Sequence, residues 1–320
     1  MKRCAFLVAV LVCCSATASS DTPKRPHILG IAYVRIFVSN VDKARNFYSA
    51  ALHAVPPPGD PKLPCAWCER APTSLTLKKN HLGLVELETL QGKDPTDLLN
   101  EIAFETSDVR KLREFLQKYR LSVEKLKKCG EDPCFTIRDP ENHTLVFLQR
   151  SDAPSVEVPG AYSPIPFRSP IIHAGFIVRD RAATEHFYKD ILGFRPYWHG
   201  GMKDHQTDWV SMQVPDGTDW LEFMVNVEPN ADQRLRGIMN HIAIGVPDIH
   251  AAEKKLQENG VKLTEEPKIG RDGKWQLNLY DPDLTRIEFM EFTPVQKPCC
   301  SDFTGPHPGP QSPSKASTKP

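Results

Sequence analysis

Short runs of alternating apolar and polar residues recur along this chain, and polar turns separate them from stretches with apolar residues every three or four positions. Alternation is typical of a half-buried strand, and the wider spacing is typical of a helix with one apolar side. Residues 28–52 and 168–192 each contain a strand, a turn and a helix of this kind. Apolar residues also mark one side of two further predicted helices, 107–119 and 247–258.

The same pattern occurs twice in the sequence. Residues 28–52 resemble residues 168–192, and residues 100–150 resemble residues 240–292. The Phe-Tyr pairs of the first two segments lie 140 residues apart, and the Asp-Pro pairs of the other two lie 142 residues apart. A near-constant offset indicates an internal duplication. Each half is itself two copies of one unit, which consists of a strand, a helix and two or three strands.

These units predict an α+β fold of four βαβββ modules, paired into two domains. The N-terminal domain spans residues 27–150 and the C-terminal domain spans residues 169–293. Residues 151–168 are rich in proline and are interpreted as a linker, and the tail, 294–320, combines proline with serine, lysine and glycine. Such a tail has too little apolar surface to order itself, so we expect it to be disordered. We expect a monomer in which the two domains pair internally.

The first residues are typical of an export signal. Lys2 and Arg3 precede an apolar run at 4–14, and small residues follow at 16–18. This run is too short to cross a bilayer, and no later segment has the roughly twenty apolar residues that a span requires. We therefore expect residues 1–18 to be a signal peptide, and the mature protein to be periplasmic or secreted, with no membrane span.

Charge and composition narrow the class of partner. The chain is 40% hydrophobic, and its forty Lys and Arg residues balance forty Asp and Glu residues, so the formal net charge is zero. A general role on nucleic acid or on a membrane surface needs a basic excess. We expect a small-molecule substrate and no nucleic-acid partner.

Export changes how the cysteines are interpreted, because disulfides persist in oxidising compartments. Six of the nine cysteines lie beyond the predicted signal peptide. Cys129 and Cys134 flank a predicted hairpin tip, where a local disulfide is plausible. Cys65 and Cys68 form a CxxC pair, but no second CxxC or His pair accompanies it, so a structural disulfide or free thiols are favoured over a zinc or redox site. Six cysteines allow fifteen pairings, and the full connectivity stays open.

Four polar side chains occupy strand positions that should face the inside of a curved sheet in the C-terminal domain. They are His173 on the first strand, Glu222 on the last strand of the same module, His241 on the next first strand and Glu288 on the final strand. Their neighbours in sequence are apolar, and an unpaired charge among apolar residues is costly, so a cation is the simplest partner. Two imidazoles and two carboxylates suit a divalent ion such as Zn, Ni, Co, Mn or Fe. We predict one such metal ion, bound by these four residues.

The paired βαβββ modules, the Phe-Tyr pair in the first helix and the final segment from Asp-Pro to Arg-Ile-Glu-Phe together resemble the vicinal oxygen chelate superfamily. That superfamily includes glyoxalase I, extradiol dioxygenases and bleomycin-resistance proteins, and the resemblance covers both domains. It implies metal ligands that project from strands into a cup and leave positions open to the substrate. The order His173, Glu222, His241, Glu288 resembles that of bacterial glyoxalase I.

The N-terminal domain departs from this pattern. Its equivalent positions hold Tyr33, Glu86, Glu101 and Val146, with no histidine among them. Tyrosine and valine cannot replace imidazole and carboxylate as ligands of comparable strength. We therefore expect this domain to be metal-free and structural.

Two enzymatic functions and one binding function remain open. A glyoxalase-like lyase or isomerase would use Glu288 or Glu222 as the catalytic base beside the metal, on a small substrate with vicinal oxygens. An Fe(II)-dependent extradiol-type dioxygenase acting on an aromatic substrate would need only His173, His241 and Glu288. The resemblance to extradiol dioxygenases implies a tyrosine at the position where this chain has Asn278. A non-catalytic small-molecule binding or resistance protein would bind without turnover. The four-ligand count favours the lyase or isomerase.

Overall fold

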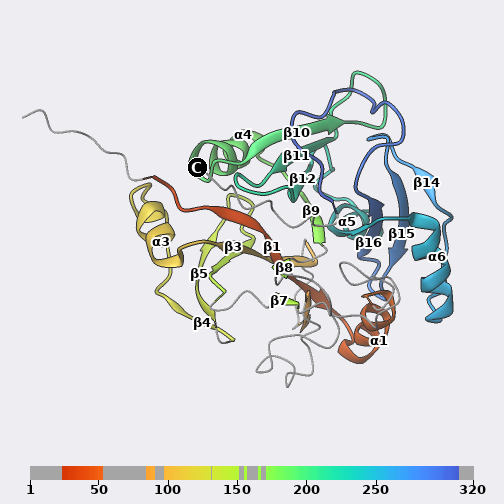
Figure 1. Cartoon of the computed structure of the whole chain (residues 1–320), viewed down its shortest axis with the longest axis horizontal. Coiled ribbons are helices and arrows are strands. Elements are labelled where there is room, and N and C mark those ends of the chain that lie inside the picture. Colours follow the sequence, from red (N-terminus) through yellow and green to blue (C-terminus); the bar gives the residue numbers. More distant parts are fainter. Residues whose placement is uncertain are drawn as a thin grey trace, which may run out of the picture.

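The chain folds into two large curved sheets with associated helices (Figure 1). The structure is a computed structural model, and it describes residues 24–52, 84–90, 97–130, 132–150, 155–156, 165–166 and 171–309. One apolar core contains residues of both sheets and of their helices.

The N-terminal sheet has the strand order β2-β1-β3-β6-β5-β4. Its domain consists of β1 (Ile28–Val38), α1 (Val41–Leu52), β2 (Val85–Thr89), β3 (Leu99–Thr106), α3 (Val109–Gln117), β4 (Lys127–Cys129), β5 (Asp132–Arg138) and β6 (Thr144–Leu148). Strand β1 pairs parallel with β2 and antiparallel with β3, and β3 pairs parallel with β6. Two modules therefore meet where β1 and β3 lie side by side.

The C-terminal sheet has the strand order β10-β11-β12-β9-β13-β16-β15-β14. Its domain consists of β9 (Ile171–Ile177), α4 (Arg181–Glu185), the π-helix η1 (His186–Ile191), β10 (Arg195–Gly200), β11 (Trp209–Gln213), β12 (Trp220–Met224), α5 (Gln233–Met239), β13 (His241–Val246), α6 (Ile249–Glu258), β14 (Lys268–Ile269), β15 (Trp275–Tyr280) and β16 (Arg286–Glu291). Strand β9 pairs parallel with β12 and antiparallel with β13, and β13 pairs parallel with β16. This junction repeats that of the N-terminal sheet, and the predicted α+β fold of paired modules is confirmed.

Aspartate side chains begin several of these helices. Asp108 precedes α3, Asp180 precedes α4 and Asp248 precedes α6, and each carboxylate accepts a hydrogen bond from a backbone N–H of the first turn. Such a cap satisfies a donor that has no partner inside the helix, and its loss costs about 1 kcal/mol. The helices predicted at 107–119 and 247–258 are confirmed as α3 and α6.

The Phe-Tyr and Asp-Pro motifs of the two halves hold the domains together. The hydroxyl of Tyr48 in α1 donates to Asp281 of the C-terminal domain (2.9 Å). The hydroxyl of Tyr188 in η1 donates to Asp139 of the N-terminal domain (2.9 Å). Both tyrosines are fully buried, and α1 lies beside the C-terminal domain in Figure 1. Each domain therefore anchors a helix of the other.

The prediction of a disordered tail is wrong for residues 294–309, which we call the strap. The backbone N–H of Val295 donates to the carbonyl of Gly273 in the turn between β14 and β15 (2.8 Å), and that of Thr304 donates to the carbonyl of Tyr197 in β10 (3.0 Å). Because β10 and β14 are the two edge strands of the C-terminal sheet, the strap connects its two ends.

The aromatic side chain of Phe303 helps to anchor the strap, although the composition of the tail is mostly polar. The ring of Phe303 lies 4.9 Å from that of Tyr197 and 6.3 Å from that of Trp198, between centroids. Backbone hydrogen bonds to a sheet edge do not depend on apolar side chains. A segment rich in proline and serine can therefore be ordered by an edge strand.

Several predictions fall on residues that the structure does not describe. These are the signal peptide at 1–18, the pair Cys65 and Cys68, and residues 310–320 of the tail. Within the linker at 151–168 the structure describes only the pairing of β7 (Ser155–Val156) with β8 (Ile165–Pro166). Among the described residues no helix combines the length and the apolar character needed to cross a membrane.

Candidate metal centre

The four polar residues predicted for the C-terminal domain come from four adjacent strands. Glu222 lies on β12, His173 on β9, His241 on β13 and Glu288 on β16, and these strands are neighbours in that order. Cross-strand pairing sets Glu222 and His241 on either side of Gly175. We call these five residues the C-terminal cup.

The donor atoms of the C-terminal cup converge. His173 Nε2 and His241 Nε2 lie 3.0 Å apart. Glu222 Oε2 lies 3.3 Å from His241 Nε2, and Glu288 Oε2 lies 3.5 Å from His173 Nε2 and 3.9 Å from His241 Nε2. Metal–ligand bonds of about 2.0–2.2 Å separate tetrahedral donors by about 3.4 Å. The spacing of these donors therefore fits one metal ion, and His173, Glu222 and His241 form a cluster able to hold one.

Glycine at position 175 makes room for this arrangement. A Cβ atom added there would lie 2.0 Å from Cε1 of His241. Any larger residue would displace the imidazole from the cup.

His241 has the tautomer and the charge that a metal ligand needs. Its Nδ1 lies 3.1 Å from the carbonyl oxygen of Met239, and only a protonated Nδ1 can donate to that acceptor. The lone pair is therefore on Nε2, which faces the other donors. Burial and the positive charge of Arg286 lower the pKa of His241 to about 4. The imidazole is neutral near pH 7, and neutral imidazole is the form that binds metals.

The two carboxylates of the cup are ionised but differ in exposure. Burial alone would raise the pKa of Glu288, but the charge of Arg286 and the hydrogen bond with His173 outweigh it and lower the pKa to about 2. Against the same effect of burial, the hydrogen bond with His241 and the charge of His173 lower the pKa of Glu222. The Glu222 side chain is 14% exposed and that of Glu288 is 4% exposed. Glu222 is thus the donor nearest to solvent.

The equivalent positions of the N-terminal domain surround an arginine. Strand pairing sets Arg35 opposite Glu86 on β2 and opposite Glu101 on β3, as Gly175 is set opposite Glu222 and His241. Val146 on β6 and Glu288 on β16 also occupy equivalent positions. Val146 pairs with Ala103 of β3, and Glu288 pairs with Ala243 of β13. We call Tyr33, Arg35, Glu86, Glu101 and Val146 the N-terminal cup.

Arg35 supplies the positive charge of the N-terminal cup. Its Nη1 donates to Oε2 of Glu101 (2.9 Å), and its Nε donates to Oε2 of Glu86 (2.8 Å), with a further bond from Nη2 to Glu86. The hydroxyl of Tyr33 donates to Oε1 of Glu101 (2.9 Å). The guanidinium therefore takes the carboxylate oxygens that a metal ion would need.

Comparison with known proteins agrees with this geometry for the C-terminal half. Residues 171–289 match the model of the Glyoxalase/Bleomycin resistance protein/Dioxygenase superfamily. The C-terminal domain belongs to this superfamily. The chain is also 28% identical over 123 residues to a lactoylglutathione lyase of Haemophilus influenzae, a match that covers 38% of this chain and 91% of the relative.

Solved structures of the superfamily fold extend the likeness to both domains. A variant of homoprotocatechuate 2,3-dioxygenase from B. fuscum matches with a TM-score of 0.56 and 17% identity, over 88% of this chain and 75% of that one. A catechol 2,3-dioxygenase matches with a TM-score of 0.56 and 16% identity, over 87% of this chain and 94% of that one. At this identity the likeness concerns the fold alone.

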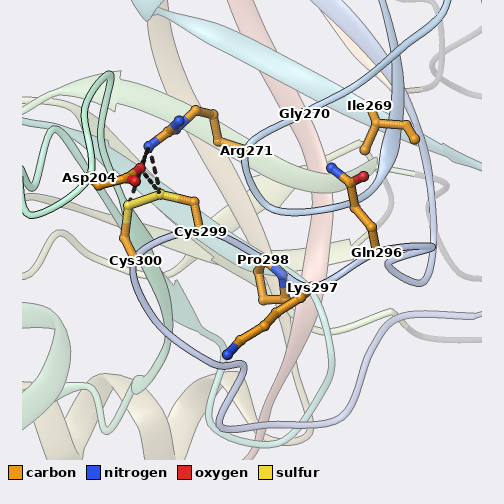
Figure 2. A pocket seen from close by; sticks show the side chains of 9 residues that line it. All are labelled: Asp204, Ile269, Gly270, Arg271, Gln296, Lys297, Pro298, Cys299 and Cys300. Atoms are coloured by element: carbon orange, nitrogen blue, oxygen red, sulfur yellow. Dashed lines mark hydrogen bonds and ion pairs between the residues drawn. A yellow bond between two sulfur atoms is a disulfide. The ribbon is translucent and has the colours of Figure 1, made fainter.

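An apolar cluster lies beside the cup. The ring of Trp220 lies 4.7 Å from the imidazole of His173, between centroids, and Phe303 of the strap packs against the cluster. The cluster is made of Ile172, Tyr197, Trp198, Trp220, Ala243 and Met290. A surface pocket of about 430 Å³ lies beside the strap. Figure 2 shows residues that line it, among which Arg271 contacts Asp204 and the Cys299–Cys300 disulfide. Asp204 and these two sulfur atoms lie close enough to share a metal. The sulfurs are bonded to each other, so they are not thiolate ligands.

Sequence reasoning missed three charged residues near the cup: Asp272, Lys274 and Arg286. Arg286 Nη2 lies 4.0 Å from Oε2 of Glu288. Burial lowers the pKa of Lys274 and raises that of Asp272. Arg286 lies in the same strand as Glu288, two positions before it, and the alternation of strand side chains was the available signal. Lys274 and Asp272 lie in a turn and had no such signal.

Proposed function

We propose that the C-terminal domain is a divalent-metal-dependent lyase or isomerase of glyoxalase type, acting on a small substrate that carries two neighbouring oxygens. The fourth donor is the observation that carries the proposal. A triad of two histidines and one carboxylate would be complete with His173, His241 and Glu288, yet Glu222 Oε2 also lies 3.3 Å from His241 Nε2. The similarity to a lactoylglutathione lyase supports the same class.

In this proposal His173, Glu222, His241 and Glu288 hold one divalent ion: nickel, zinc, cobalt, manganese or iron. When bound, such an ion is a Lewis acid that draws electron density from the oxygens of the substrate. One of the two carboxylates, Glu222 or Glu288, accepts a proton from the carbon next to a carbonyl and returns it to the neighbouring carbon. The apolar cluster beside the cup limits the access of water to this transfer.

Glu222→Gln is the test, because it removes the fourth donor and a candidate base while preserving shape. We expect turnover to fall by about 10²- to 10⁴-fold, and metal content to fall as well. The assay follows conversion of methylglyoxal hemithioacetals formed with several low-molecular-weight thiols, alongside elemental analysis. Glu86→Gln, at the equivalent position of the N-terminal cup, is the matched control and should change neither. Unchanged metal content and turnover in Glu222→Gln would contradict the proposal.

A ring-cleaving dioxygenase is the second candidate, favoured by the two-domain likeness to extradiol enzymes. That function predicts O₂ uptake with catechols by the Fe(II)-loaded protein, and only a mild effect of Glu222→Gln. A binding protein without catalysis predicts that ligand and metal are retained with no turnover in either assay. These assays, made on one preparation of the protein, therefore distinguish the three functions.

We propose further that the chain is exported. The apolar run at 4–14 supports this, as does the Cys129–Cys134 disulfide, because such bonds persist in oxidising compartments. N-terminal sequencing of the natural protein should find a start near Ala18. An intact Met1 in a cytosolic fraction would contradict export.

A further inference from the structure

Lys274 is a buried cation that the proposed proton transfer does not use. It lies in the turn between β14 and β15, its side chain is fully buried, and its Nζ has no hydrogen-bond partner among the described residues. The ammonium lies over the rings of Trp220, Phe303 and Tyr197, at 4.5, 5.1 and 5.6 Å from their centroids. Ring contacts offset only part of the cost of burying an ammonium ion. Its N–H donors therefore need an acceptor.

The buried carboxyl group of Asp272 does not fill this need. Its Oδ1 accepts hydrogen bonds from the backbone N–H of Lys274 (3.2 Å) and from Nε2 of Gln276 (3.1 Å). No hydrogen bond joins it to Nζ of Lys274 in the described part of the chain. Asp272 fixes the turn that carries Lys274, and its charge stabilises the ammonium without a hydrogen bond to Nζ.

The ammonium lies close to the C-terminal cup. The ring of Trp220 is 4.5 Å from Nζ of Lys274 and, between centroids, 4.7 Å from the imidazole of His173. The ammonium and that imidazole are therefore no further apart than the sum of these two distances. Besides Asp272, the negative charges of Glu288 and Glu222 stabilise the charged lysine against the cost of its burial. The indole of Trp220 therefore lies against both the ammonium of Lys274 and the imidazole of His173.

We propose that Lys274 is a specificity-determining residue that binds a carboxylate group of the substrate, while the neighbouring oxygens of that substrate are held at the cup. This inference rests on the proposed metal-dependent function. A carboxylate provides charged acceptors for an ammonium, and charge-assisted bonds are the strongest of these contacts. A neutral substrate would leave the buried ammonium without an acceptor. The site therefore selects small acids that carry two neighbouring oxygens.

Two chelating probes that differ by one carboxylate test the selection. Acetohydroxamate and the monohydroxamate of succinic acid both present two neighbouring oxygens, and only the second carries a carboxylate. Calorimetry on the nickel- or zinc-loaded full chain should show that the succinic probe binds about 10- to 100-fold more tightly. In Lys274→Met this preference should disappear, with the metal content and the affinity for acetohydroxamate unchanged. Equal preference in wild type and Lys274→Met would overturn the proposal.

A second measurement needs no metal, and it separates this inference from the proposed function. Acetate should raise the melting temperature of the wild-type protein and leave that of Lys274→Met unchanged. Lys297→Met is the control, because Lys297 is an exposed lysine of the strap, and it should respond to acetate as wild type does. A metal-free protein with this Lys274-dependent response would refute the metal function and keep the carboxylate subsite. A metal-loaded protein that shows neither the acetate response nor the probe preference would refute the carboxylate subsite and keep the metal function.

Discussion

The N-terminal cup places two carboxylates around the guanidinium of Arg35, whereas the C-terminal cup places two carboxylates beside two imidazoles and a glycine. The strands pair in the same way in both, so position 35 is equivalent to position 175. An arginine at this position supplies a cation from within the chain. A glycine leaves space for His241, whose Nε2 then faces both carboxylates. One backbone plan therefore yields an internal ion cluster or a cluster able to hold a metal ion, according to the side chains on four strands.

The contacts between the domains show a second difference between equivalent positions. Asp139 and Asp281 each accept a hydrogen bond from a buried tyrosine of the other domain. Asp139 is also bonded to His143 (3.1 Å), and the position equivalent to His143 holds Thr285. Only the N-terminal Asp-Pro turn therefore carries a titratable imidazole.

Gly175→Arg is the change with the largest expected effect, because it gives the C-terminal cup the residue of the N-terminal one. The new side chain would meet His241 and neutralise Glu222, so metal affinity should fall by several orders of magnitude. Equilibrium dialysis with zinc measures the affinity, and far-UV circular dichroism checks the fold. If a folded Gly175→Arg protein binds metal as wild type does, position 175 does not decide the difference between the cups.

The pH dependence of unfolding tests the difference at His143. Burial alone would lower the pKa of His143, but the hydrogen bond with Asp139 and the charges of Asp139 and Asp97 outweigh it and raise the pKa to about 9. A raised pKa in the folded state stabilises the protein below the unfolded value of about 6.5, and this stabilisation is lost as the pH rises through 9. We expect a loss of roughly 3 kcal/mol across this window. In His143→Thr the denaturant midpoint should depend less on pH between pH 6.5 and 9. An equal pH dependence of the midpoint in the variant and in wild type would contradict the assignment.

Arg35→Ala should have a smaller effect, on stability and not on the C-terminal metal. The free energy of unfolding should fall by about 1–3 kcal/mol, because Glu86 and Glu101 lose their charged donor. Added manganese or zinc should restore part of the melting temperature of this variant. Arg110→Ala, at an exposed position of α3, is the control and should change stability by less than about 0.5 kcal/mol. If added metal stabilises Arg35→Ala no more than it stabilises wild type, the guanidinium does not stand in for a cation.

The fold and the four donors were predictable because strand and helix periodicities repeat at a constant offset. That offset aligned His173 and His241 with Tyr33 and Glu101, and strand pairing in the structure matches the alignment. The strap was not predictable, because backbone hydrogen bonds to edge strands leave no composition signal. Arg35 was visible in the sequence, but its place between Glu86 and Glu101 depends on the pairing of three strands.

The burial of Lys274 could not be predicted from the sequence. It lies in a polar turn between two strands, and such a turn is normally exposed. Its burial depends on Phe303 of the strap, nearly thirty residues further along the chain. A contact of that kind follows from the tertiary structure and from no local pattern.

Metal stoichiometry tests the central claim most directly. The protein, purified without chelators and analysed for its elements, should contain one divalent ion per chain. His241→Ala removes the imidazole that lies 3.0 Å from His173, and its metal content should fall to near zero, whereas Glu101→Ala at the equivalent position of the N-terminal cup should keep one ion. Two ions per chain in wild type, or full metal retention in His241→Ala, would contradict the account.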